Sequence, residues 1–161
     1  MRPGHWLWRS LVLILACATL GCGGKKEPED MIKISIVSTG DPAQRDILMV
    51  PDLDGASVEV WEYKEPVDLS TKKKDAKPVP PTRTARVTKA DWAALWKAFP
   101  KGHVWTLTDQ KGGAASAPVY TLELKNNGRH VKAVVEGPEQ AADKSAWQII
   151  EPCLKLAGVG K

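Results

Sequence analysis

The sequence predicts one α+β domain, in which an antiparallel sheet of about five to six strands carries two helices packed on one face. Three observations lead to this fold class. Apolar and polar residues alternate around Ile32, which is typical of a half-buried strand. Two more alternating runs flank Asn127 and Gly128, as in a β-hairpin. Apolar residues recur at helical spacing over residues 92–99 and again over residues 147–157.

Composition indicates a globular chain and excludes a polytopic membrane protein. The 161 residues are 43% hydrophobic and 26% charged, with a formal net charge of +4. Without Arg2 and Arg9, which lie in a segment expected to be removed, 21 basic and 19 acidic residues leave +2. Nothing in this balance indicates nucleic acid as a partner, since that function needs a concentrated basic face. The longest apolar run is shorter than the about 20 residues of a spanning helix, which excludes a polytopic membrane protein.

The N-terminus has the pattern of an export signal. Arg2 and Arg9 supply positive charge ahead of an apolar run over residues 11–20. We therefore expect residues 1–21 to be a signal peptide. A plain secretory signal or an uncleaved anchor is the alternative for this segment.

Residues 19–22 resemble the lipobox of bacterial lipoproteins, with a small glycine before Cys22. Thr19 departs from that pattern, which prefers Leu at this position. The resemblance implies that Cys22 is acylated, with palmitate as a typical chain. Cys17 is the alternative lipidation site, but it would leave a shorter apolar core in the signal.

Residues 22–30 are predicted to be a flexible tether, because the segment after Cys22 is polar and spans roughly 30 Å at most. The lipobox resemblance implies a lipid-anchored place in the cell envelope. Gly23 follows the cysteine in place of the Asp that retains lipoproteins in the inner membrane. We therefore expect the outer membrane, facing the periplasm, if the cell is Gram-negative. Cys153 is then left without an internal disulfide partner.

The globular domain is predicted over residues 31–161. Residues 64–82 form a Lys/Pro-rich loop that cannot build a helix or a central strand. This loop is either an extended or disordered excursion, or a surface that binds a partner or an anionic surface. Strands are expected at residues 32–36, 46–50 (closed by Pro51), 57–63 and 84–87.

The best helix signal begins at Thr88, which has the N-cap position of a capping box with Asp91. A strand is expected next at residues 103–108, with Trp105 and Leu107 on one face. The apolar stripe of the helix comprises Trp92, Leu95, Trp96 and Phe99, and Pro100 and Gly102 stop it.

Asn127 and Gly128 suit the two positive-φ positions of a type I′ turn, which fixes the register of the hairpin. In that register Glu123 faces Lys132, and the apolar pairs share the opposite face. The other expected pairs are Asn126 with Arg129, Lys125 with His130, Leu124 with Val131, Leu122 with Ala133 and Tyr120 with Val135.

The second helix is expected to start near Ser145, with Gln148 completing a capping box. Pro152 should kink it, and Gly158 ends it. Its buried stripe is expected to comprise Trp147, Ile150, Leu154 and Ala157. Stacking both helices on the sheet would bury Trp92, Trp96, Trp105 and Trp147 together.

The sequence contains no familiar catalytic motif, and we predict no catalytic, cofactor-binding or metal-binding residue. His103 and His130 are expected at solvated ends of loops. Cys153 is interpreted as a small buried hydrophobe, although a Cys153–His pair would be the alternative that makes the protein an enzyme. Residues 51–55 form a turn between strands rather than a calcium loop.

Residues 82–157 are similar to the core of emfourin-type small protease inhibitors. The resemblance rests on Trp92 and Leu95, Asp109, the run from Tyr120 to Leu124, and His130 with Val131. It implies inhibition of thermolysin-like metalloproteases. The long Lys/Pro loop departs from that family, so no inhibitory residue is carried over.

The sequence therefore predicts a lipid-anchored envelope protein that is not an enzyme but a binding or scaffolding module. Its expected partners are the membrane, through the N-terminal lipid, and an envelope protein. A secreted or anchored inhibitor of the emfourin type is the alternative.

Overall fold

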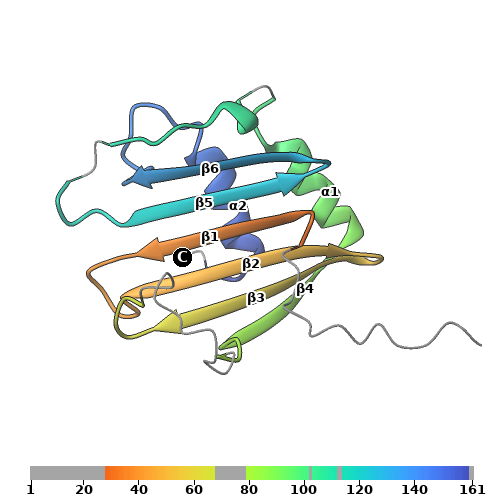
Figure 1. Ribbon diagram of the computed structural model, residues 1–161, viewed down its shortest axis with the longest axis horizontal. Helices are drawn as coiled ribbons and strands as arrows, with labels where there is room; N and C mark the ends of the chain where they lie inside the picture. The colour runs from red at the N-terminus through yellow and green to blue at the C-terminus, as the bar shows by residue number, and fades with distance from the viewer. Residues whose placement is uncertain (1–27, 68–78, 102, 112–113, 160–161) are drawn as a thin grey trace, which may run out of the picture.

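The structure is a computed structural model that describes residues 28–67, 79–101, 103–111 and 114–159. It contains one six-stranded antiparallel sheet and two α-helices, which confirms the predicted α+β fold (Figure 1). The strand order is β4-β3-β2-β1-β5-β6, and both helices lie behind the sheet in this view. The elements are β1 (Met31–Val37), β2 (Gln44–Asp52), β3 (Gly55–Tyr63), β4 (Arg83–Thr88), α1 (Lys89–Ala98), the 3-10 helix η2 (Val104–Thr106), β5 (Val119–Asn126), β6 (Arg129–Glu136) and α2 (Trp147–Leu156).

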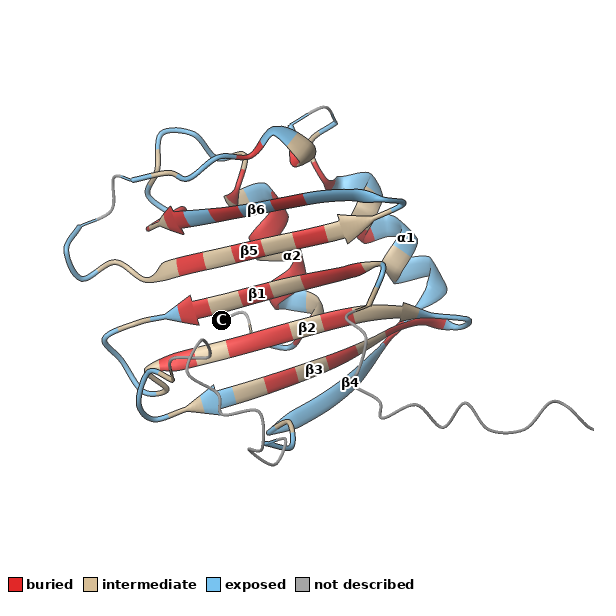
Figure 2. Ribbon diagram, in the orientation of Figure 1, coloured by how far each residue is buried: buried red, intermediate tan, exposed pale blue. Residues whose placement is uncertain are grey.

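The core lies between the sheet and the two helices. Alternate residues of the central strands are buried there, which produces the striped burial pattern of Figure 2. Ile34 sits at the centre, paired with Ile47 on one side and Leu122 on the other, and all three are fully buried. Each such side chain contributes about 1.5–3 kcal/mol by leaving water. The helices add Leu95, Ile149, Ile150, Cys153 and Leu154 to the same core.

β2 is longer than predicted, because the expected stop at Pro51 is wrong. Pro51 pairs with Ala56 of β3 inside the strand. The β1 ladder begins only at the pair of Ile32 and Met49, so Pro51 lies where β2 pairs only with β3. A proline is tolerated at such an edge position, since no ladder hydrogen bond toward a second neighbour is required.

The predicted register of the β5–β6 hairpin is confirmed at every pair, including Glu123 with Lys132. Asn127 and Gly128 have φ values of 50° and 74°, as the type I′ turn requires. The turn chemistry and the alternation of apolar residues specify the same register, which is why this region was predictable.

Thr88 caps α1 as predicted: its hydroxyl oxygen accepts the N–H of Asp91 at 3.1 Å. The Asp91 carboxylate in turn accepts the Thr88 hydroxyl at 2.7 Å. Leu95 and Phe99 are buried, whereas Trp92 and Trp96 are only partly buried.

The strand predicted at residues 103–108 is wrong, because this segment contains η2. Val104 and Leu107 are buried three positions apart, which is helical rather than alternating spacing. The hydroxyl and N–H of Thr106 both donate to the carbonyl oxygen of His103. Trp105 is half-buried and stacks on Trp96 with 6.2 Å between ring centroids.

The predicted common cluster of four tryptophans is wrong for Trp147. Its ring meets Tyr120 edge-on with 6.2 Å between ring centroids, whereas Trp96 contacts both Trp92 and Trp105. All four rings pack against the core and remain partly exposed.

α2 begins later than predicted, at Trp147, and its N-cap is Ala146 without a side-chain hydrogen bond. The predicted capping box of Ser145 with Gln148 is therefore wrong. The Ser145 N–H instead donates to Asp143 Oδ1 at 2.9 Å, and the Gln148 N–H donates to the carbonyl of Lys144.

The C-terminus of α2 is as predicted, since Gly158 ends the helix with a φ of 65°. The N–H groups of Gly158 and Val159 return to the carbonyls of Lys155 and Leu154, which completes a Schellman motif.

The proposed signal peptide, residues 1–21, lies outside the described residues, and so does the tether before residue 28. Asp30 is the last residue of the predicted tether, and its Oδ1 accepts the backbone N–H of Asn127 at 2.9 Å. The start of the domain is thereby fixed to the β5–β6 turn.

Candidate functional site on the open face of the sheet

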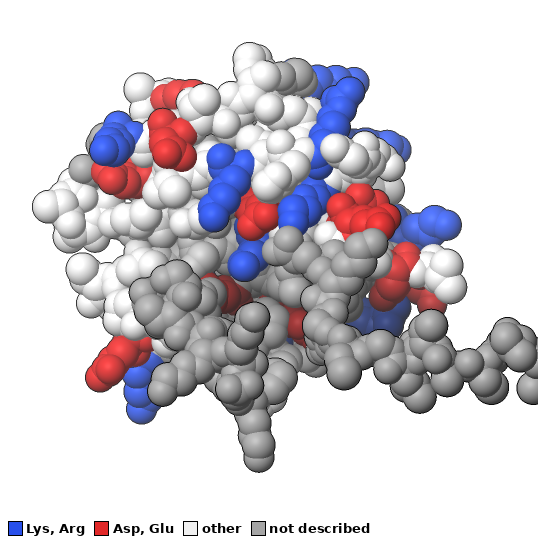
Figure 3. All heavy atoms as spheres, in the orientation of Figure 1, with Lys and Arg blue, Asp and Glu red and all other residues white. Residues whose placement is uncertain are grey.

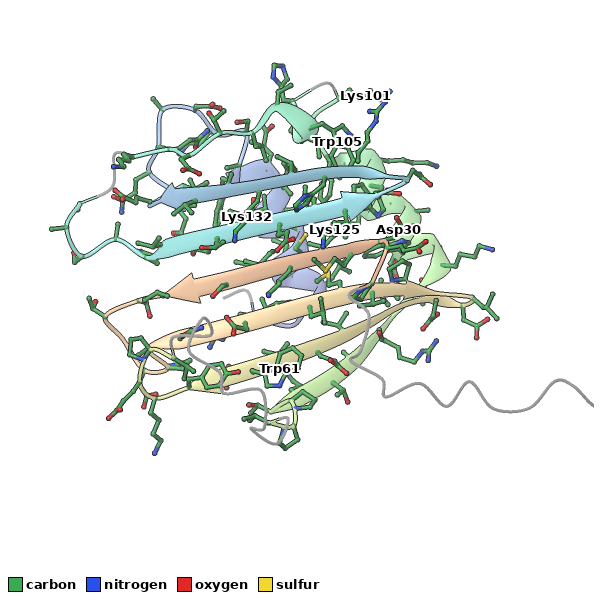
Figure 4. The ribbon with its side chains drawn as sticks, in the orientation of Figure 1. Asp30, Trp61, Lys101, Trp105, Lys125 and Lys132 are labelled. Atoms are coloured by element: carbon green, nitrogen blue, oxygen red, sulfur yellow. The ribbon has the colours of Figure 1, made fainter. Side chains whose placement is uncertain are left out.

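The helices cover one face of the sheet, and the other face carries mainly polar side chains. Figure 3 views this open face and shows Lys and Arg side chains gathered near its middle, with acidic side chains among them. Figure 4 places Lys125 and Lys132 over β5 and β6, and Trp61 over β3. The strand pairings assign these residues to one face, because directly paired residues share a side.

A lysine cluster lies where β1, β5 and β6 meet. We define it as Lys33, Lys125 and Lys132 together with Glu123 and His130. Lys33 and Lys132 are the register partners of Glu123 on its two sides. Lys125 pairs with His130 in the next row of the same face.

Glu123 is the acidic centre of the lysine cluster. Its Oε1 lies 3.0 Å from His130 Nε2 and 3.5 Å from Lys125 Nζ. The side chains of Glu123 and Lys125 are only 14% and 18% exposed, so this contact is more shielded from water than an ordinary surface ion pair. The Glu123 carboxylate therefore has partners on both β5 and β6, namely Lys125 and His130.

Lys33 and Lys132 have no ion pair among the described residues, although Glu123 lies between them. Lys132 is exposed and Lys33 is half-buried. Three ammonium groups around one carboxylate give the lysine cluster a positive balance. Its chemistry favours a partner with carboxylate or phosphate groups.

The other half of the open face holds a buried carboxylate. Asp46 is 5% exposed and accepts the Ser35 hydroxyl at 2.6 Å and the Gln44 amide at 3.1 Å. Burial raises the pKa of the nearby Tyr63 hydroxyl, and the Asp46 charge adds to this effect. The network satisfies a polar group that would otherwise destabilise the fold.

The two ends of the predicted loop 64–82 are attached to this half of the face. The Val67 N–H donates to Gln44 Oε1 at 2.7 Å. Trp61 Nε1 donates to the carbonyl of Val79 at 3.1 Å, and the Glu62 N–H donates to Thr82 Oγ1. The loop therefore leaves and rejoins the sheet beside β2 and β3, and its residues 68–78 lie outside the described part.

The predicted histidine and cysteine positions are now defined. Cys153 is fully buried, as predicted, and burial raises the pKa of its thiol, which disfavours the nucleophilic thiolate. His103 is exposed beside η2, and His130 is exposed in the lysine cluster. The predicted lipidation sites, Cys22 and Cys17, lie outside the described residues.

The turn predicted at residues 51–55 is confirmed only at Leu53 and Asp54, because Pro51 and Asp52 belong to β2 and Gly55 begins β3. Internal partners occupy the Asp52 carboxylate. Asp52 Oδ1 accepts the Asp54 N–H at 3.0 Å, and Asp52 Oδ2 lies 2.8 Å from Arg86. Within the described ranges, no group of three or more His, Cys, Asp or Glu side chains could hold a metal ion. Among the same residues, neither helix has the length and apolar character needed to span a bilayer.

The sequence predicted the Glu123–Lys132 pair but not the lysine cluster or the Asp46 network. Lys33 belongs to the cluster only because β1 pairs with β5, almost ninety positions later in the chain. A pattern within one strand cannot reveal such a partner. Comparisons of this chain with protein-family models and with curated proteins gave no match.

Proposed function

We propose that this protein is a lipid-anchored component of the cell envelope that binds another envelope component without catalysing a reaction. The lipobox-like sequence before Cys22 supports the anchor. The lysine cluster on the open face is the observation that carries the binding role. It combines two lysines, Lys33 and Lys132, that have no ion pair with any described residue, and a face that the helices leave uncovered.

The position of Asp30 supports a short link between anchor and domain. Residues 23–30 would span roughly 30 Å at most, and Asp30 is held at the β5–β6 turn. An anchor at Cys22 would therefore keep that end of the sheet close to the bilayer. Several acyl chains make such an anchor durable, because each buried methylene contributes about 0.8 kcal/mol.

Intact mass of the protein extracted from membranes tests the anchor. We expect a mass that fits residues 22–161 plus acyl chains. Labelling with a palmitate analogue should be lost in Cys22→Ala and kept in the matched variant Cys17→Ala. Loss of labelling only in Cys17→Ala would assign the acylation to Cys17. A protein that is unacylated in both the mass and the labelling measurements would refute the anchor.

Photo-crosslinking in cells tests the binding face. A photoreactive amino acid at position 132 should give a discrete adduct, since Lys132 is exposed in the lysine cluster. The same amino acid at position 97, on the exposed side of α1, is the matched control and should not give that adduct. Equal adducts from both positions, or none from position 132, would contradict binding through the open face.

A protease inhibitor of the emfourin type is the second candidate. The order β4, α1, β5, β6 and α2 favours it, although η2 replaces the strand that the resemblance included. Titration against a thermolysin-like metalloprotease decides the matter. Stoichiometric inhibition would support this candidate, and full residual activity would remove it.

A further inference from the structure

The two edge strands of the sheet, β6 and β4, differ in how far other described residues cover them. The edge of β6 is covered near its C-terminal end by the segment around Gln110. The Gln110 N–H donates to the carbonyl of Val134 at 2.9 Å, and the Glu136 N–H donates to the carbonyl of Gln110 at 3.0 Å. The Val134 N–H donates to Asp109 Oδ1 at 2.8 Å. Backbone groups that would otherwise invite another strand are thus occupied.

The edge of β4 has no such cover among the described residues. All six residues of β4 pair with β3 in an unbroken register, so the strand has no bulge that would twist its edge away. Only Val87 is buried, and Figure 2 shows β4 exposed along its length at the lower border of the sheet. An exposed regular edge of this kind is a template for a further strand.

The ladder identifies which backbone groups of β4 face outward. Within a strand, the N–H and C=O of alternate residues point to the same neighbouring strand. The Glu62 N–H points toward the β4 side, because it donates to Thr82. Val60 and Val58 share this direction, so their partners Arg83 and Ala85 bond back to β3.

The same alternation leaves the N–H and C=O groups of Thr84 and Arg86 pointing away from the sheet. The close approach of the Val87 carbonyl oxygen to Gly55 agrees with this, since Val87 must then also face β3. Thr84 and Arg86, two residues apart, therefore present their N–H and C=O groups outward at the spacing that an added antiparallel or parallel strand requires.

The charged side chains of β4 do not block this edge. Arg83 donates to the carbonyl of Gly158 at 3.1 Å, and Arg86 lies 2.8 Å from Asp52 Oδ2. Both guanidinium groups are therefore turned toward their own chain. The small side chain of Ala85 is exposed between them and leaves room for a neighbouring strand.

We propose that β4 binds an extended peptide segment of a partner protein as a seventh strand. Arg83 and Arg86 lie on opposite faces of the sheet, because they pair with Val60 and Ser57, so carboxylate side chains on the two faces of this segment meet them. Charge complementarity assigns the occupant. The Arg86 side chain is 64% exposed even with Asp52 as its neighbour, so it can accept a second carboxylate. This inference goes beyond the proposed anchor and does not depend on it.

A second copy of the chain is a poorer occupant of this edge. Pairing β4 with itself about a two-fold axis would place Arg86 of both copies on one face of the joined sheet and Arg83 of both copies on the other. Like charges across adjacent strands destabilise the pairing. An acidic partner segment avoids this repulsion.

Amide hydrogen exchange of the full chain in detergent solution, followed by NMR, tests the proposal. The probe is a short capped peptide in which pairs of Glu residues alternate with pairs of Val residues, so that each face of the bound strand carries carboxylates. At saturation it should slow exchange of the Thr84 and Arg86 amides by about tenfold or more. The same peptide with Lys in place of Glu should protect them much less.

Thr84→Pro removes one outward N–H without removing a bond to β3, and it should weaken binding of the Glu peptide by about tenfold. Thr84→Val is the matched control, because it keeps the N–H and the β-branched shape. A Glu peptide with N-methyl groups on its pairing edge tests the same bonds on the unaltered protein, and it should not bind.

Three outcomes would overturn the proposal. Thr84 and Arg86 amides that stay unprotected by the Glu peptide would exclude strand addition. Equal protection by the N-methylated peptide would exclude it as well, whereas equal protection by the Lys peptide would exclude carboxylates as the recognised groups. Protection that arises without peptide and increases with protein concentration would assign the edge to a second copy.

Discussion

Gly55 lies where the β2–β3 turn meets the end of β4. Its φ of 146° is a conformation that residues with a side chain rarely adopt. A Cβ at this position would also lie 2.0 Å from the carbonyl oxygen of Val87. The backbone atoms around it cannot yield without disturbing the β3–β4 ladder. Gly128 is the opposite case, since its φ of 74° is held in the β5–β6 turn with open space around the missing Cβ.

Gly55→Ala is expected to lower the free energy of unfolding by about 3 kcal/mol or more, because strain and a backbone clash add together. Gly128→Ala should cost only about 1–2 kcal/mol, since the strain acts alone. Urea denaturation of both variants checks this order. An equal loss of stability in the two variants would show that the Val87 contact does not constrain Gly55.

The N-cap of α1 gives a second test at single-residue scale. Thr88→Ala removes the acceptor for the Asp91 N–H, and it should lower stability by about 1 kcal/mol. Thr88→Ser retains the hydroxyl and should stay close to the parent protein. Thermal and chemical unfolding would contradict the cap if Ser and Ala behaved alike.

At the scale of single elements, the sequence predicted best where two local signals agreed. The β5–β6 register followed from the turn at Asn127 and Gly128 together with alternating apolar residues. α1 followed from Thr88 and its apolar spacing. In each case the stabilising contacts lie within the element, so a short window of sequence contains them.

The failures occurred where contacts outside the window decided the structure. Val104 and Leu107 bury themselves against the core through η2, although Trp105 and Leu107 also fit a strand pattern. Asp143 takes the Ser145 N–H, which removes Ser145 from the N-cap of α2. Pro51 continues β2 because β1 does not extend beside it.

α2 contains Pro152 in its interior, where it lacks an N–H to donate to the carbonyl of Gln148. Pro152→Ala restores this donor and removes the ring, so we expect a gain of about 1–3 kcal/mol in stability. Part of the gain is offset, because proline also restricts the unfolded chain.

The matched control for this helix is Glu151→Ala, which removes a surface ion pair with Lys155 at 2.9 Å. It should change stability by about 0.5 kcal/mol or less. Differential scanning calorimetry of both variants gives the comparison. A less stable Pro152→Ala protein would mean that packing of the proline ring outweighs the missing hydrogen bond.

At the scale of the whole molecule, buried ionisable groups make the fold sensitive to alkaline pH. Burial raises the pKa of the Cys153 thiol above its ordinary value of 9.0. Burial, with the Glu139 charge and hydrogen bond, raises the pKa of Tyr120 above 10.0. Above these ordinary values the unfolded chain loses protons that the native protein retains. Stability is therefore fully present at neutral pH and falls as the pH rises.

We expect the free energy of unfolding to decline from about pH 9 upward, by up to about 1.4 kcal/mol per pH unit for the thiol alone. Urea titrations under reducing conditions at successive pH values measure this slope. Cys153→Ala and Tyr120→Phe should each lower stability at pH 7 but flatten the alkaline decline. An unchanged slope in both variants would exclude these groups as its cause.

The central place of β1 has a mechanical consequence. β1 follows directly on the segment that would join the domain to its anchor, and it lies between β2 and β5. Six residue pairs join it to β2 and seven join it to β5. Tension applied at the N-terminus would therefore act along β1 and shear both ladders at once, so that their hydrogen bonds resist the force together instead of opening one after another.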